Sequence, residues 1–345
     1  MNEQEMINVV IIGAGVIGVS TAYRLLQAAP YLSVTVVADK FSPDNTSDGL
    51  AGVWEPYEAY DTPKELVKSW GRKTYEHAMH LIHCDPQAKN YGMFSTQSVI
   101  LSDKEHSELP DYWDFVDNPY VLTEQELKRY QTQPKSGYTY NTVFIIGRLY
   151  VPMLMKKISA LCGKFLCKKI NNFNEVANFD LIINCCGLGA RELSGDQNVF
   201  PARGHLVRVK APWIKTAITY ETKEGDTYYV LPNIDDVVVR GSYEVGNFNT
   251  DVIVSDRERI MKNAINLVPS LKDAEYIRDW VGLRPGRTSV RLEKEDMCVN
   301  GKTLKVVHNY GHSGIGITLH WGCAEDAVNL ALEFIAEIRS VKSKL

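Results

Sequence analysis

The sequence has 345 residues, with 38 basic and 42 acidic side chains and a formal net charge of −4. This length is enough for one large domain or two moderate domains, each with a substantial core. The balanced charge provides no basic stripe of the kind that binds nucleic acid, and the longest apolar run is too short to span a bilayer.

The first predicted unit begins at residue 8 and has the order strand, turn, helix, strand. Residues 8–12 form a short apolar run, which predicts a buried strand. A helix is expected over residues 20–29, where apolar residues share one face, and a second strand over residues 33–38. The turn before the helix has the G-x-G-x-x-G spacing and consists of Gly13, Ala14, Gly15, Val16, Ile17 and Gly18.

This pattern predicts a dinucleotide-binding site rather than an ordinary glycine-rich turn. Its glycines allow the tight turn, the close approach of a pyrophosphate and the packing of helix against strand. The helix N-terminus offers unpaired N–H groups and the positive end of its dipole to phosphate. Asp39 follows the second strand, where a carboxylate can accept hydrogen bonds from a ribose.

The rest of the chain alternates between helical patterns and short strands. Helices are expected over residues 64–83, 123–130, 151–162, 255–267 and from about 317 to 339. Strands are expected over residues 93–101, 179–186, 205–209, 227–231, 237–239 and 305–310. Pro152 is placed in the first turn of its helix, and residues 280–287 are expected to form a strand that breaks at a Pro-Gly turn.

A second glycine-rich turn between strand and helix, at residues 311–316, lies about 300 residues after the first. We therefore expect an α/β fold in which the last strand and helix return to the nucleotide-binding domain. The β-rich region over residues 200–243 predicts a second, antiparallel sheet in a domain inserted between the two turns.

The cysteine spacing and the two ends of the sequence indicate the cellular compartment in which the protein is expected. The seven cysteines include no C-x-x-C motif, so we expect buried, reduced thiols and no metal. Residues 1–6 lack the basic and apolar regions of a signal peptide. The tripeptide Ser343-Lys344-Leu345 is an S-K-L sequence, which predicts binding to the peroxisomal import receptor and localisation in the peroxisomal matrix.

Several segments together resemble the D-amino-acid oxidase and D-aspartate oxidase family of flavoenzymes. These segments are residues 9–21, 51–57, 184–189, 203–205, 229–232 and 281–287, and above all 308–312 with 320–322. The resemblance implies noncovalently bound FAD in a Rossmann-like βαβ domain, with an inserted, mainly antiparallel β substrate domain. It places the FAD-binding domain at residues 1–60, 145–195 and 285–345 and the substrate domain at 61–144 and 196–284. A homodimer is also possible for a protein of this family.

The reaction that the resemblance implies is the oxidative deamination of a D-amino acid to a 2-oxo acid, ammonia and hydrogen peroxide, with oxygen as acceptor. By matching position, Arg284 would bind the substrate carboxylate through its guanidinium fork. Tyr229 would donate a further hydrogen bond, and Gly314 would direct its carbonyl at the substrate amine. Without the resemblance, a structural salt bridge is the simpler role for Arg284, and core packing is the simpler role for Tyr229.

The resemblance also assigns residues to FAD without assigning a side-chain base. His308 and His312 are expected to order the second glycine loop, because enzymes of this family act on the neutral amine of the substrate. Besides the first glycine turn, the positions that match FAD-lining residues are Asp39, Lys40, Thr46, Ser47, Ala51, Gly52, Val53, Ile170, Ser313, Gly316, Ile317 and Thr318.

The expected substrate side-chain pocket includes Glu55, Thr219 and Tyr243. D-aspartate oxidases have arginines at the positions of Thr219 and Tyr243, and Glu55 would repel a second carboxylate. Neutral or basic D-amino acids are therefore the expected substrates. D-aspartate oxidase is the alternative, in which the missing arginine is replaced by Lys215, Lys223 or Arg240.

Three other functional classes stay open at this point. A glycine or sarcosine oxidase would use the same FAD chemistry on a related amine. A flavoprotein without catalytic activity would have the same fold and bind FAD but would release no peroxide. The first glycine turn, taken by itself, is equally typical of an NAD-dependent dehydrogenase.

Overall fold

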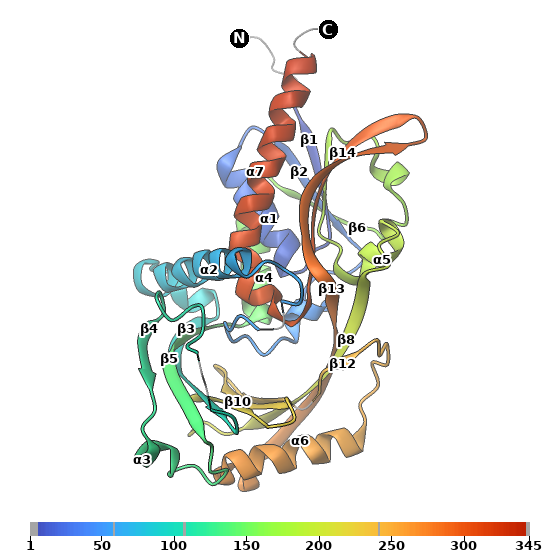
Figure 1. Ribbon diagram of the computed structural model, residues 1–345. Coiled ribbons are helices and arrows are strands. Elements are labelled where there is room, and N and C mark those ends of the chain that lie inside the picture. The colour runs from blue at the N-terminus through green and yellow to red at the C-terminus, as the bar shows by residue number, and fades with distance from the viewer. Residues whose placement is uncertain (1–5, 58, 106–107, 241, 343–345) are drawn as a thin grey trace.

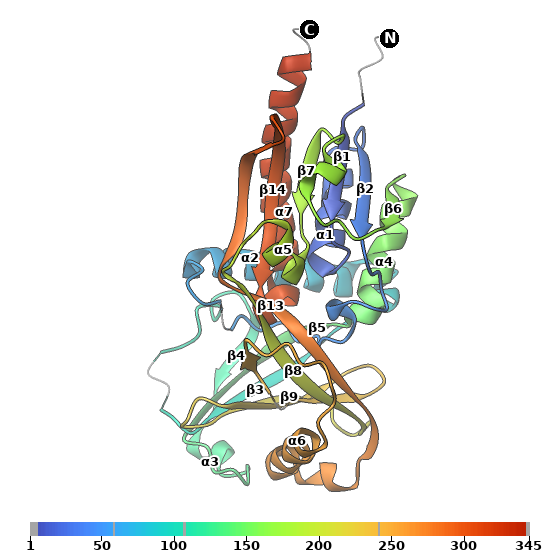
Figure 2. The ribbon, with the colours of Figure 1, turned by 90° about the vertical axis from the view of Figure 1, so that its right-hand side faces the viewer.

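The computed structural model describes residues 6–57, 59–105, 108–240 and 242–342, which form an elongated molecule with two halves (Figures 1 and 2). One half contains parallel strands in the spatial order β6 (Lys164–Cys167), β2 (Ser33–Ala38), β1 (Asn8–Ile12), β7 (Leu181–Asn184) and β14 (Lys302–His312). Beside them, α1 (Val16–Ala28) packs against both α4 (Gly147–Ala160) and α7 (Gly316–Lys342). The expected strand–turn–helix–strand unit at the start of the chain is confirmed.

The other half is built from mainly antiparallel strands. Their spatial order is β4 (Asp117–Val121), β5 (Ser136–Ile145), β3 (Met93–Ser102), β9 (Ala217–Glu221), β10 (Thr227–Pro232), β11 (Val237–Arg240), β8 (Val199–Lys210) and β13 (Glu275–Val299), with β12 (Glu244–Val245) beside β8. The helices are α2 (Lys64–Cys84), which crosses between the halves, the short α3 (Glu124–Leu127) and α5 (Ala190–Leu193), and α6 (Val254–Leu267), which covers the far end (Figure 1).

The antiparallel strands do not form a separate second sheet, as the sequence predicted, but continue the parallel one. β13 pairs with β8 in one half and with β14 in the other, so the described strands belong to a single sheet, with β12 as a branch beside β8. Figure 2 shows β13 running from one half into the other. The α/β fold itself is confirmed.

The expected Pro-Gly turn at residues 285–286 is also wrong. Both residues lie inside β13, where Pro285 pairs with Pro201 and Gly286 with Phe200. The Phe200 ring occupies the space beside Gly286, because a Cβ atom there would lie 2.3 Å from it. Packing across the sheet therefore overrides the local turn signal, and the only trace of it is a register shift after Gly286.

Two smaller expectations are corrected. α4 begins at Gly147, so Pro152 lies inside the helix and not in its first turn. The helix begins there because the Ile146 carbonyl accepts hydrogen bonds from the Leu149 and Tyr150 amides, both at 2.9 Å. Gly147 leaves room for the Ser47 backbone, since a Cβ atom on it would lie 1.8 Å from the Ser47 carbonyl oxygen. All seven cysteines are free, as expected, but only Cys185 and Cys323 are fully buried.

Candidate active site

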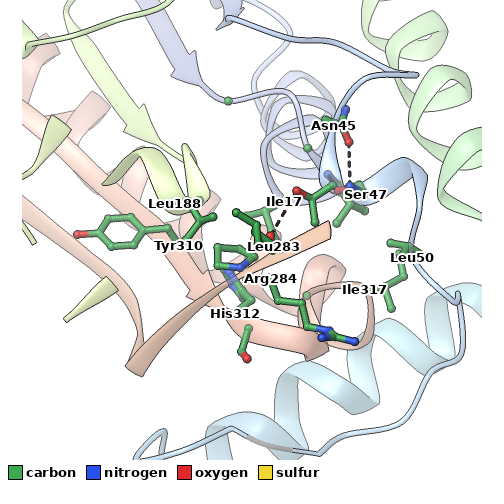
Figure 3. Close-up of a pocket in the computed structure, with 18 of the residues that line it drawn as sticks. Ile17, Asn45, Ser47, Leu50, Leu188, Leu283, Arg284, Tyr310, His312 and Ile317 are labelled. Atoms are coloured by element: carbon green, nitrogen blue, oxygen red, sulfur yellow. Dashed lines mark hydrogen bonds between the residues drawn. The ribbon is translucent and has the colours of Figure 1, made fainter. Parts of the chain in front are cut away.

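A cavity of about 760 Å³ lies where the two halves meet, and both halves line it (Figure 3). Its walls come from the β1–α1 turn, the segment after β2, the concave face of the antiparallel strands and the turn between β14 and α7. Ligand sites are typically concave, partly apolar and placed between such units. This cavity is therefore the candidate site.

One end of the cavity is formed by the β1–α1 turn. Gly13 has φ +109°, and a Cβ atom on it would lie 2.3 Å from the Cys185 carbonyl oxygen. A Cβ atom on Gly18 would lie 1.9 Å from the Gly13 carbonyl oxygen. Gly15 precedes α1 and offers no side-chain cap, so the first turn of the helix presents N–H groups and a positive dipole end. This end suits a pyrophosphate.

A short segment after β2 closes over that turn. The Asn45 Oδ1 atom accepts a hydrogen bond from the Ser47 amide at 2.9 Å, and the Ser47 Oγ atom accepts one from the Val16 amide at 2.9 Å. Thr46 Oγ1 donates to the Leu283 carbonyl at 3.5 Å on β13 (Figure 3). The segment thus joins the nucleotide end of the cavity to the strand that carries Arg284.

Most of the predicted cofactor residues line this cavity. Gly18 and Thr318 do not: Gly18 packs against the first glycine, and Thr318 Oγ1 donates to the Glu55 carbonyl at 3.1 Å. The predicted cofactor residues in the wall are Gly13, Ala14, Gly15, Val16, Ile17, Asp39, Lys40, Thr46, Ser47, Ala51, Gly52, Val53, Ile170, Ser313, Gly316 and Ile317.

The other end of the cavity is built on one row of the antiparallel strands. Residues that lie directly opposite each other in neighbouring strands share a face of the sheet. The pairing register makes such a row of five residues, one from each strand, and all of them line the cavity: Thr219, Tyr229, Arg240, Leu206 and Trp280. Arg284 follows four residues after Trp280 on β13 and so faces the same side.

Arg284 has the features of a carboxylate ligand. Its Nη1 atom is buried and has no hydrogen-bond partner among the described residues. A Cβ atom on Gly204 of β8 would lie 2.3 Å from that Nη1 atom, so glycine leaves room for the guanidinium. A buried donor without a partner costs roughly 1–3 kcal/mol, and an anion in the cavity would remove that cost.

Around Arg284 the structure gathers aromatic side chains. A Cβ atom on Gly314 would lie 2.6 Å from the Tyr57 hydroxyl and 3.3 Å from Arg284 Cδ, so only glycine fits there. The Tyr243 ring lies 5.3 Å from the Arg284 guanidinium, and its hydroxyl is 2.9 Å from Ser313 Oγ. Burial raises the pKa of Tyr229 to about 12, which keeps its hydroxyl a donor at neutral pH.

Three charged side chains, Glu55, Glu221 and Arg240, line one part of this end, which we call the far part of the substrate site. Burial, with a smaller contribution from Glu221, raises the pKa of Glu55 to about 7, although Arg240 acts in the opposite direction. The Arg240 guanidinium lies 5.5 to 5.8 Å from the ring centres of Tyr57, Tyr229 and Tyr243. Of the three cations considered for the missing arginine, Arg240 is in the wall, whereas Lys215 and Lys223 are exposed.

The two histidines near the second glycine turn are buried and neutral. His308 lies 3.0 Å from Glu295 and 3.3 Å from Asn184, and burial lowers its pKa to about 4. Burial lowers the pKa of His312, which lines the cavity, to about 3. The contacts of His308 join β14 to β13 and β7, whereas the Nε2 atom of His312 has no hydrogen-bond partner among the described residues. A role of the two histidines in ordering the loop stays a prediction.

The sequence left several wall residues unassigned. Tyr57 belongs to a segment that carries the family resemblance but has no predicted role, and Glu221 and Trp280 are not among the predicted site residues. Alternation along β9 and β13 would have placed Glu221 on the face of Thr219, and Trp280 on that of Arg284. The predicted pocket residue Tyr243 contacts Arg284 and Arg240 without being part of the cavity wall.

Two kinds of feature are absent from the part of the chain that the structure describes. No group of three or more His, Cys, Asp or Glu side chains there is arranged to hold a metal ion. In the same residues, no helix has the length and apolar character needed to cross a membrane.

Comparison with known proteins agrees with this geometry. A family model described as FAD dependent oxidoreductase (DAO) matches residues 8–330. The chain is 35% identical to a D-amino acid oxidase of Dugesia ryukyuensis, over 96% of this chain and 99% of the relative. It is also 35% identical to the D-aspartate oxidase of Homo sapiens, over 96% of each chain.

Solved structures share the fold at lower identity. Glycine oxidase from Geobacillus kaustophilus matches with a TM-score of 0.75, 18% identity and 94% coverage of each chain. L-alpha-glycerophosphate oxidase from Mycoplasma pneumoniae, which contains FAD, matches with a TM-score of 0.72 and 16% identity, over 95% of each chain. At these identities the similarity concerns the fold.

Proposed function

The chain belongs to the DAO family of FAD dependent oxidoreductases, and from this premise we propose that it oxidises D-amino acids at the α-carbon. Its cofactor is FAD, so the NAD-dependent dehydrogenase suggested by the first glycine turn alone is no longer a candidate. The products are a 2-oxo acid, ammonia and hydrogen peroxide.

The nucleotide end of the cavity fits FAD. Gly13 and Gly18 leave no room for a Cβ atom, and this brings the backbone close to where a pyrophosphate would lie. Asp39 lies in the cavity wall at the end of β2, the position of a ribose-binding carboxylate. FAD, when bound, supplies a two-electron acceptor that oxygen regenerates with release of hydrogen peroxide.

The observation that carries the proposed substrate is the unpartnered Nη1 atom of Arg284 in the cavity. A guanidinium binds a carboxylate with two parallel charge-assisted hydrogen bonds, which fix both position and angle. The Tyr229 hydroxyl provides a further donor in the same end. Together they would hold the carboxylate of an amino acid and leave its α-carbon directed by the wall around Gly314.

Two features support neutral or basic substrates over D-aspartate and D-glutamate. Thr219 occupies one of the positions where the resemblance places an arginine, and two carboxylates, Glu55 and Glu221, line the far part of the site. D-aspartate oxidase is the second candidate, because Arg240 lies in that same wall. An amine oxidase of the glycine or sarcosine type shares the fold and is distinguished by its substrates.

The test is peroxide release by the purified flavoprotein across a panel of D- and L-amino acids, glycine and sarcosine. We expect oxidation of D-amino acids, no activity on L-isomers, and D-aspartate as a poor substrate. Activity confined to glycine and sarcosine, or no peroxide with any amino acid from a protein that contains FAD, would overturn the proposal.

We also propose import into the peroxisome through Ser343-Lys344-Leu345, which lie outside the described residues. A peroxide-producing reaction suits an organelle that contains peroxide-degrading enzymes. A fluorescent protein fused to the N-terminus should give punctate fluorescence that becomes cytosolic when the tripeptide is deleted. Cytosolic fluorescence of the undeleted fusion would contradict this address. The homodimer also stays a prediction.

A further inference from the structure

We propose that the far part of the substrate site selects D-amino acids whose side chain carries a positive charge, such as D-lysine or D-ornithine. In this arrangement, Glu55 and Glu221 supply the carboxylates, and Thr219 supplies a neutral acceptor. The inference rests on the proposed function and narrows it from neutral or basic substrates to cationic ones.

The charges of the side chains at this end of the cavity favour a cationic substrate. The charged side chains in the wall here are Glu55, Glu221, Arg240 and Arg284. The α-carboxylate of the substrate takes the charge of Arg284. Two carboxylates then face one guanidinium, that of Arg240, so a cationic side chain would complete the balance.

The Thr219 hydroxyl is a buried acceptor in the same wall. Thr219 is only 3% exposed, and its Oγ1 atom has no hydrogen-bond partner among the described residues. It lies in the cavity wall directly opposite Tyr229 in the neighbouring strand. Glu221 follows two residues later on β9 and therefore shares its face. A substrate ammonium group donates three hydrogen bonds and accepts none, which matches a hydroxyl and two carboxylates in the same cavity wall.

The backbone of Glu55 is anchored by two hydrogen bonds to one side chain. Its amide donates to Thr318 Oγ1 at 3.2 Å, and its carbonyl accepts from the same hydroxyl at 3.1 Å. Thr318 is itself in α7, so the backbone of Glu55 is held from outside the loop that carries it. This backbone therefore needs no ordering when a ligand binds to the Glu55 side chain.

The same geometry disfavours a substrate with a second carboxylate. Arg240 is enclosed by the rings of Tyr57, Tyr229 and Tyr243 and shares the wall with both glutamates. A third carboxylate would bring three negative groups to one guanidinium in a buried site, where like charges repel strongly. In this wall the charge of Arg240 offsets one of the two glutamates, which leaves the other to pair with a cationic side chain of the substrate.

The experiment compares D-lysine with D-norleucine, which has the same carbon chain without the ammonium group, and with D-glutamate. The readout is the ratio of kcat/KM for D-lysine to that for D-norleucine, because damage to the whole site changes both values. We expect the holoenzyme to favour D-lysine. Glu55→Gln or Glu221→Gln should lower the ratio by about tenfold to a hundredfold, the usual effect of losing a charged hydrogen-bond partner.

The matched control is Glu224→Gln. Glu224 is exposed, lies three residues after Glu221 and is not part of the cavity wall, so its substitution should leave the ratio unchanged. If a glutamate variant fails to fold, Thr219→Val provides a second test with nearly the same side-chain volume. It too should lower the ratio.

The outcomes separate the two proposals. If no D-amino acid is oxidised, the proposed function fails. If D-amino acids are oxidised but D-norleucine or D-glutamate exceeds D-lysine, the function stands and this inference is overturned. A ratio that is unchanged in both Glu55→Gln and Glu221→Gln would also overturn it.

Discussion

The two ends of the cavity are built in different ways. The nucleotide end comes largely from one continuous stretch, β1 with the turn into α1, and its contacts are backbone groups brought close by glycines. The substrate end takes side chains from five strands between residues 199 and 299, and adds a segment near residue 55 and the turn before α7. One end is local in sequence, whereas the other exists only when the sheet is assembled.

This difference predicts two patterns of sensitivity. A backbone site depends on the absence of Cβ atoms, so it should fail abruptly when one is added. A side-chain site distributes its binding over several groups, so each substitution should give a graded loss. The following predictions test this contrast, in order of decreasing effect.

The largest effect is expected for Gly13→Ala. The new Cβ atom would lie 2.3 Å from the carbonyl oxygen of Cys185, the residue directly after β7, and Gly13 has φ +109°. The strained backbone alone costs roughly 1–3 kcal/mol, and strand β7 would have to move. We expect purified protein without FAD, measured by flavin absorbance, and a lower unfolding temperature.

Gly71→Ala is the control for that variant. Gly71 is a buried helical residue of α2 at which a Cβ atom would meet its nearest neighbour at an ordinary 3.6 Å. It should retain FAD and stability. A Gly13→Ala protein with normal flavin content would contradict the account of the nucleotide end.

Arg284→Ala should show the largest graded loss at the substrate end. The loss of a charged hydrogen-bonding partner raises KM for a D-amino acid by about tenfold to a hundredfold. FAD content should stay normal, because Arg284 is not among the groups at the pyrophosphate end. Arg284→Lys should recover only part of the loss, since an ammonium group cannot form the bidentate fork. Unchanged kinetics would assign Arg284 a structural role.

The ionisation of Glu55 should make the selectivity of the substrate end depend on pH. With a pKa of about 7, its carboxyl group is neutral below that pH and negative above it. The D-lysine to D-norleucine ratio of kcat/KM should therefore rise by about tenfold from pH 6 to pH 8. Both substrates share the α-amine, so its titration cancels in the ratio.

The other titratable and charged groups near Glu55 are Glu221, Arg240, Tyr112, Tyr138, Tyr140 and Tyr229. Burial raises the pKa of each of these tyrosines, so they stay neutral throughout this range. The pH dependence should disappear in Glu55→Gln. An equal slope in that variant would assign the titration to another group.

The smallest effect is expected for Tyr243→Phe, which keeps the ring beside Arg284 and removes the hydroxyl bonded to Ser313 and Tyr60. The loss of one neutral hydrogen bond costs about 1 kcal/mol, or about fivefold in kcat/KM. Tyr31→Phe, at an exposed tyrosine of the nucleotide half, is the control and should have no effect on kcat/KM. If Tyr243→Phe lowered kcat/KM as much as Arg284→Ala, the predicted graded loss at the substrate end would be contradicted.

The predictability of the two ends from the sequence follows the same contrast. The unit from residue 8 to Asp39 could be predicted because its spacing, periodicity and glycines all act over a few tens of residues. Arg284 and Tyr229 were assigned only through the resemblance to a family. Their own neighbours in sequence gave no sign that Gly204, on another strand, would leave room for a guanidinium.

The errors have the same origin. Pro285-Gly286 is a strong local turn signal, yet the register with β8 keeps both residues in the strand. Arg240 was considered only as a substitute for another arginine, because its position beside Tyr229 depends on which strands become neighbours. That choice is made by long-range packing, and a single sequence does not display it.

The return of the last strand to the first sheet also affects how the chain folds during synthesis. β7 lies between β1 and β14, and α1 packs against α7, although β14 begins about 300 residues after β1. At roughly 5–20 residues per second, the ribosome needs roughly 15–60 s to deliver these partners. Such long-range pairing slows folding. We therefore expect the half that is encoded first to be completed last, so that FAD binds only after β14 and α7 have joined β7 and α1.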